Sequence, residues 1–138
     1  MKRFVSAGAA TVVLLSLSGC VSPPSPFDGE RKASDQLPAV VSEVIPTGDA
    51  SSSRYQGKAD GRELYLVKGK GDYQFCLAYT DGTKDGSGAS CSGGPWVKVT
   101  FPDQAEFEVQ LHGFADKPAD GQKQVSKWVR QTAPARGT

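Results

Sequence analysis

The sequence predicts a small, mainly β fold of the α+β class: an antiparallel sheet or barrel of five to six strands with one short N-terminal helix. Two observations support this prediction. Short segments of alternating apolar and polar residues are separated by turns, and the chain contains 16 glycines and nine prolines in 138 residues. The one helical spacing of apolar residues comes before the first of these segments.

The helix is predicted between Asp35 and Ile45. Asp35 is a favourable N-cap, and Pro46 would end the helix. An irregular strand is the alternative, because β-branched residues dominate the segment. Residues 47–53 are expected to form a loop of small residues. The apolar residues with helical spacing are Leu37, Val40, Val41, Val44 and Ile45.

Four strands are predicted in two hairpins. The first hairpin pairs residues 63–68 with residues 73–80 around a Gly-Lys-Gly-Asp turn. Both alternating faces of its second strand carry residues that can be buried, which indicates a central strand. The second hairpin joins residues 96–101 to residues 106–111 and has the most regular alternation in the chain. Residues 122–130 are expected to supply a last strand.

The start of the chain has the organisation of a secretory signal. Two basic residues precede an apolar stretch that ends in Leu17-Ser18-Gly19-Cys20. This order resembles the bacterial lipobox, and the resemblance implies removal of residues 1–19 and attachment of fatty acids such as palmitate to Cys20. An uncleaved anchor is the alternative, but the apolar stretch is shorter than the about 20 residues that span a bilayer.

The same resemblance sets the expected organisation and location. Cys20 would hold the protein at the extracytoplasmic face of the cell membrane through its lipid. Residues 20–34 contain three prolines and are predicted to be a flexible tether. Residues 35–131 would form the β domain, and residues 132–138 a disordered tail.

The two remaining cysteines predict a disulfide. With Cys20 lipidated, Cys76 and Cys91 form an even pair in an oxidising compartment. Two free thiols or a two-cysteine metal site are the alternatives. His112 is the single histidine, and zinc usually needs four ligands, so we expect no metal and no cofactor.

The net charge of +1 argues against nucleic acid as a partner. Phosphate binding needs a concentrated basic face, and the mature chain would be close to neutral. A basic stretch without acids lies near the C-terminus, and it is either a solvated tail or a contact for anionic lipid or wall polymer. Its residues are Lys123, Lys127, Arg130 and Arg136.

A glycine-rich loop carries the candidate binding residues. Asp81 and Asp85 resemble the start of a calcium loop, but the twelfth position is Ser92 instead of the required glutamate, so an ordinary turn is favoured. Loops on a rigid scaffold often carry contacts, and the predicted disulfide would fix this one. We therefore select Asp81, Asp85 and Trp96 as binding residues, although tryptophan is more often a core residue.

No catalytic residues are expected. His112 follows a strand end and lies in no nucleophile motif, which indicates a surface position. Glu106 and Glu108 would share a strand face, but charged residues that alternate along a strand usually face solvent.

A wider pattern gives a second resemblance. Ser53-Arg54, Asp60-Gly61-Arg62-Glu63-Leu64-Tyr65, Phe75-Cys76-Leu77 and Ala89-Ser90-Cys91 follow the Leu-Pro start of the predicted helix. Together they are similar to small uncharacterised secreted and membrane proteins of high-GC Gram-positive bacteria, a group that implies no activity. The expected function is a non-enzymatic binding module of the cell envelope with a protein or cell-wall ligand. The alternatives are an inhibitor of a secreted or envelope hydrolase and an envelope enzyme.

Overall fold

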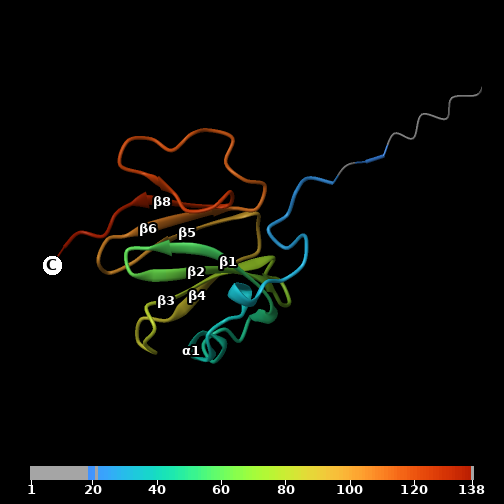
Figure 1. Ribbon diagram of the computed structural model, residues 1–138, viewed down its shortest axis with the longest axis horizontal. Helices are drawn as coiled ribbons and strands as arrows, with labels where there is room; N and C mark the ends of the chain where they lie inside the picture. The colour runs from blue at the N-terminus through green and yellow to red at the C-terminus, as the bar shows by residue number, and fades with distance from the viewer. Residues whose placement is uncertain (1–18, 21, 138) are drawn as a thin grey trace, which may run out of the picture.

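The protein folds into two four-stranded antiparallel sheets, which confirms the mainly β class (Figure 1). The computed structural model describes residues 19–20 and 22–137, so the predicted signal lies almost entirely outside the described residues. The sheets stay separate, and the barrel alternative is therefore wrong for this part of the chain.

The first sheet, sheet A, has the strand order β1-β2-β3-β4. The second, sheet B, has the order β5-β6-β8-β7, so the chain leaves β6, forms the short β7 at the edge and returns as β8 between them. A 3-10 turn η1 and a helix α1 precede the strands. The bounds are η1 (Ala33–Asp35), α1 (Ala39–Ser42), β1 (Gly48–Ala59), β2 (Arg62–Gly69), β3 (Phe75–Thr80), β4 (Gly88–Ser92), β5 (Trp96–Thr100), β6 (Glu106–Gln110), β7 (Lys123–Gln124) and β8 (Val129–Ala133).

Both predicted hairpins are confirmed. β2 pairs with β3, with Leu66 opposite Leu77, and β5 pairs with β6, with Val99 opposite Phe107. The side chains of β3 alternate between two separate cores, because successive residues of a strand face opposite sides of the sheet. β3 is therefore a central strand, as its sequence predicts.

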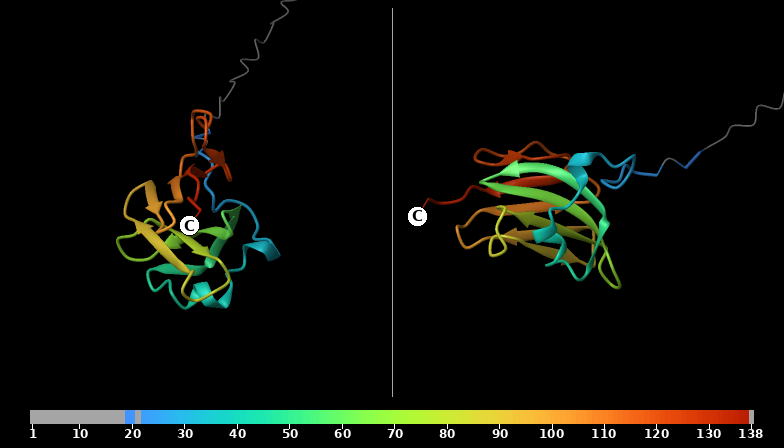
Figure 2. Two further views of the ribbon diagram at one scale, coloured as in Figure 1. Left: turned by 90° about the vertical axis from the view of Figure 1, so that its left-hand side faces the viewer. Right: turned by 60° about the horizontal axis from the view of Figure 1, so that its bottom comes forward.

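Sheet A lies between two apolar layers. One core fills the space between the sheets and includes the fully buried Phe75 and Phe107. The other core lies on the far face of sheet A, where the segment around α1 covers it (Figure 2). Its buried residues are Leu37, Val41, Ile45, Tyr65, Val67, Cys76 and Ala78. The N-terminal segment is thus a structural layer of the domain.

The predicted helix is too long. α1 covers only Ala39–Ser42 and starts after Pro38. Asp35 does not cap it, because the Asp35 carboxylate accepts the backbone N–H groups of Lys32 and Tyr55 instead. The apolar residues still face the core, which explains why their spacing resembled a longer helix.

Eight strands form instead of the expected five to six. The single last strand expected over residues 122–130 is two strands, β7 and β8, and β1 and β4 were not predicted. Residues 47–53 were expected to be a loop, but β1 begins at Gly48. β4 was read as part of a glycine-rich turn, but it pairs with β3 along residues Gly88–Ser92. Both segments consist of small residues with little alternation, and both lie at an edge of sheet A, where the neighbouring strand supplies the pairing.

The disulfide Cys76–Cys91 is confirmed. The two residues lie directly opposite each other in the β3–β4 register, so the bond ties the edge strand β4 to the central strand β3.

Both ends of the expected β domain extend further than predicted. Arg54 donates hydrogen bonds to the carbonyl oxygens of Phe27 and Gly29, which places part of the expected tether against β1. At the other end, the N–H of Ala135 donates to Asp60, and the N–H of Arg136 donates to the carbonyl of Asp103. Figures 1 and 2 show the described N-terminal segment and the C-terminal segment at opposite ends of the sandwich.

Candidate functional site

A groove on the outer face of sheet B brings together aromatic, charged and amide side chains. It has a volume of about 540 Å³ and lies at the end of the β5–β6 hairpin. The register places Trp96 opposite Gln110 and Lys98 opposite Glu108, because Val97 and Val99 between them turn toward the core. We call this site the Trp96 groove. Its residues are Pro95, Trp96, Lys98, Glu108, Gln110 and His112.

Trp96 stands exposed at the rim of this groove. Its side chain is 59% exposed, and Tyr73 is the other exposed large hydrophobic residue of the described chain. The hydroxyl of Ser92 donates to the carbonyl oxygen of Trp96 at 2.8 Å and fixes the backbone there. A second hollow of about 670 Å³ lies between Trp96 and the end of β4. An exposed indole on fixed backbone is typical of a binding surface, because indole gains contact area at low entropic cost.

The floor of the groove offers both hydrogen-bond donors and acceptors. Gln110 Nε2 donates to Glu108 Oε1 at 2.7 Å, and Lys98 Nζ pairs with Glu106 Oε1 at 3.1 Å. The hydroxyl of Thr132 and then the Lys98 ammonium hold the pKa of Glu106 below its ordinary value, so this carboxylate is charged at neutral pH. These pairs position the polar side chains on the sheet face.

No hydrogen bond or ion pair within the described structure joins His112 to a carboxylate of the groove. His112 is exposed, and among the described residues its imidazole has no hydrogen-bonding or ionic partner. Glu108 accepts a hydrogen bond from Gln110, and Glu106 accepts one from Thr132 and pairs with Lys98. The described part of the chain also has no cluster of three or more metal-ligating side chains.

Asp81 and Asp85 lie away from the Trp96 groove. The β3–β4 loop that carries them precedes β4, whereas Trp96 follows its end, so one strand length separates them. Asp81 accepts hydrogen bonds from the hydroxyl and the backbone N–H of Thr83, and both bonds lower its pKa. Asp81 is therefore used within its own turn, and Asp85 is a solvent-exposed neighbour.

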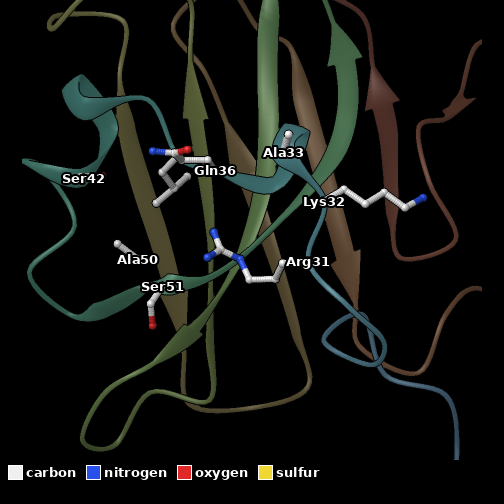
Figure 3. Close-up of a pocket in the computed structure, with 8 residues that line it drawn as sticks. Arg31, Lys32, Ala33, Gln36, Ser42, Ala50 and Ser51 are labelled. Atoms are coloured by element: carbon white, nitrogen blue, oxygen red, sulfur yellow. The ribbon is translucent and has the colours of Figure 1, made fainter.

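A different hollow lies between the N-terminal segment and the start of β1. It has a volume of about 370 Å³, and Figure 3 shows Arg31 reaching into it while Lys32 points away. The Arg31 guanidinium donates to the hydroxyl and carbonyl oxygens of Ser53 and to the carbonyl oxygen of Asp35. The Arg31 guanidinium therefore holds the N-terminal segment against β1, and this hollow has a structural role.

The basic C-terminal stretch is not one continuous surface. Arg130 is only 4% exposed and lies 4.1 Å from the centroid of the Phe114 ring. Its guanidinium donates to the side chain of Gln124 and to the side chain and carbonyl of Asp116. Arg130 therefore fastens the loop before β7 to sheet B. Lys127 remains exposed beside Trp128, with its Nζ 5.6 Å from the ring centroid.

No protein-family model matches the chain, and no match was found among the curated proteins or the solved structures. Among the described residues, no helix has the length and apolar character needed to cross a membrane. Cys20 is exposed and belongs to no disulfide.

From the sequence, Trp96 was selected as a binding residue and His112 was placed at the surface, but the groove that the two share with Lys98 and Gln110 was missed. The register of the predicted hairpin could have identified this group of residues. Once residues 96–101 pair with residues 106–111, the polar side chains of both strands must fall on the face opposite the valines.

Proposed function

We propose that the protein is a membrane-anchored extracytoplasmic lipoprotein that acts as a non-enzymatic binding module of the cell envelope. The Trp96 groove is its binding site. The observation that carries this proposal is the 59% exposed side chain of Trp96 on a sheet face that also carries paired donors and acceptors.

The groove is suited to binding because its parts are fixed before a ligand arrives. Trp96 and Lys98 belong to β5, and Glu108 and Gln110 to β6, so a regular ladder positions them. Side chains held in this way lose little freedom on association. An indole that becomes buried at the centre of an interface commonly contributes about 2 kcal/mol or more to binding.

The proposed anchor is Cys20. It is exposed and lies outside any helix or strand, so a lipid-transferring enzyme could reach it. Two or more acyl chains make membrane attachment stable, as the lipobox resemblance implies for this cysteine.

Photo-cross-linking in intact cells tests the proposal. A photoreactive amino acid in place of Lys98 lies beside Trp96 and captures protein, polymer or lipid alike. We expect Trp96→Ala to lower the cross-linked fraction of the protein at least tenfold, and Trp96→Phe to retain most of it. Thr100→Ala, on the same strand but outside the groove lining, is the matched control and should behave like the wild type.

The outcome against the proposal is equally specific. The binding role would be abandoned if His112→Ala, in a folded protein, reproduced the phenotype of a deletion strain while Trp96→Ala had no effect. Circular dichroism of each purified variant would establish that the fold is retained.

A further inference from the structure

One end of the sandwich gathers four connected turns. We call it the entry end and define it by residues 70–74, 93–96, 111–113 and 125–128. Ser92 joins two of these turns, because its carbonyl accepts the N–H of Gln74 and its hydroxyl donates to the carbonyl of Trp96. Across sheet B, Trp96 pairs with Gln110, whose N–H donates to the carbonyl of Trp128 at 3.0 Å.

The N-terminal segment reaches the body of the domain at this same end. Pro26 is buried and lines a hollow together with Trp128. The Phe27 ring packs against the core between the sheets, with Lys68 Nζ 5.7 Å from its centroid. Figure 1 shows the chain arriving at this end of the sheets, opposite the C-terminus.

The distance between Cys20 and the domain is short. Five residues lie between Cys20 and Pro26, and the six residue steps span at most about 22 Å when fully extended. A free tether reaching to residue 34 would allow about 50 Å. The additional reach is lost because Arg54 donates hydrogen bonds to the carbonyl oxygens of Phe27 and Gly29 and so fixes this segment to the domain. A lipid on Cys20 therefore keeps the entry end close to the bilayer.

The entry end also carries the side chains that favour a membrane surface. Tyr73 and Trp96, 43% and 59% exposed, are the exposed large hydrophobic residues of the described chain, and both lie here. Tyrosine and tryptophan are enriched at the head-group level of membranes because their rings are amphipathic. Lys70 and Lys127 are exposed lysines of this end, and Asp72 is an exposed acid there. Lys98 lies beside the end but pairs with Glu106, and the exposed acids Asp28 and Glu30 line the same hollow as Trp128.

We propose that the entry end docks on the membrane that holds Cys20, with Tyr73 and Trp96 in the head-group layer and the lysines facing anionic lipid. The proposal rests on the proposed function and names the partner of the Trp96 groove as anionic lipid head groups. The anchor makes this contact intramolecular, so an interaction that is weak by itself suffices. The β3–β4 loop, with Asp81 and Asp85, then points away from the bilayer.

The test uses the mature lipidated protein in vesicles of phosphatidylcholine with phosphatidylglycerol or of phosphatidylcholine alone. Brominated lipids quench tryptophan at the membrane surface, and the Trp96→Phe variant gives the signal that remains from Trp128. We expect the Trp96 emission to shift to the blue and to lose at least half its intensity in anionic vesicles. Tyr73→Ser should weaken this quenching.

Charge-reversal variants test whether lysines of the entry end contact anionic lipid. Lys70→Glu with Lys127→Glu should reduce the quenching at least twofold in anionic vesicles, whereas Lys84→Glu in the β3–β4 loop is the matched control and should not. Quenching that is equal in neutral vesicles, or equally reduced by Lys84→Glu, would overturn the anionic-lipid assignment.

The two proposals can fail separately. Protein that sediments with the vesicles but shows no quenching of Trp96 overturns the docking while leaving the anchor in place. Cross-linking of the groove to a wall polymer or a protein, without quenching, also overturns the docking but supports the binding function. Protein that carries no lipid and does not sediment contradicts the proposed anchor itself.

Discussion

Asp35 Oδ1 accepts the backbone N–H of Tyr55 at 2.8 Å, and this contact joins the N-terminal segment to the middle of β1. The other carboxylate oxygen accepts the N–H of Lys32 at 2.8 Å. Asp35 is 7% exposed, so both N–H groups would lack a partner without it. One buried carboxylate thus holds together the 3-10 turn, the strand and the segment that leads toward Cys20.

We expect Asp35→Ala to lower the free energy of unfolding by about 2–3 kcal/mol, because two backbone donors lose their acceptor in a buried position. Asp35→Asn keeps one carbonyl acceptor and should cost about 1 kcal/mol. Urea denaturation followed by circular dichroism measures both values. Equal stability of Asp35→Ala and the wild type would show that water replaces the carboxylate without loss.

The same carboxylate makes stability depend on pH. Burial alone would raise the Asp35 pKa, but the N–H groups of Lys32 and Tyr55, with Arg54 and Arg31 nearby, hold it below its ordinary value of 3.8. Its stabilising contribution is therefore present above pH 3.8 and is lost as the pH falls through the lower folded pKa. The stability difference between the wild type and Asp35→Asn should shrink on acidification, and a constant difference would contradict this assignment.

The disulfide should contribute substantially to stability. A closed loop of this length is worth about 3 kcal/mol on the chain-entropy account, and the Cys76–Cys91 bond closes a separation of 15 residues. We expect the double variant Cys76→Ala/Cys91→Ala to lose about that amount. Denaturation of the wild type with and without a reductant is the matched comparison, and the reductant should leave the double variant unchanged.

Two aromatic residues on opposite faces of sheet B should separate stability from function. Phe107 is fully buried between the sheets, so Phe107→Ala should cost about 3–5 kcal/mol. Trp96→Ala removes an exposed ring and should change stability by about 0.5 kcal/mol or less. Thermal unfolding of both variants checks this. A large loss of stability in Trp96→Ala would mean that Trp96 serves the fold.

Lipidation of Cys20 is tested by metabolic labelling with a fatty acid. We expect the label in the wild type and in the Cys76→Ala/Cys91→Ala variant, because the disulfide takes no part in the attachment. Cys20→Ser should carry none. Equal labelling of the wild type and Cys20→Ser would remove the basis for a lipid anchor at this position.

The sequence was most informative where side chains alternate by polarity. β2, β3, β5 and β6 could be predicted because one or both faces of each strand are apolar. β1 and β4 could not, because their small residues show no such pattern and their pairing depends on partners elsewhere in the chain. The helix was overextended for a related reason, since burial against sheet A gives residues 37–45 an apolar face without a continuous helix.

The candidate site was also predictable only where it depends on local sequence. Trp96 could be selected from its position at the start of a strand, but its partners depended on the β5–β6 register. Asp81 and Asp85 were grouped with it because they are close in sequence, and β4 separates them in space. The predicted tether, residues 20–34, extends too far into the domain. Its polar sequence does not indicate that Arg54 binds the carbonyl oxygens of Phe27 and Gly29.

The position of the disulfide affects how the domain responds to mechanical force. Force applied through Cys20 enters at the N-terminal segment and acts first on its bonds to Arg54 and to β1. These bonds can break one after another, so we expect the segment to detach before the sheets separate. The chain between Cys76 and Cys91 stays closed throughout, which shortens the fully stretched protein by about 50 Å. Under load, the β3–β4 hairpin therefore remains a closed loop that cannot be extended until the disulfide is reduced.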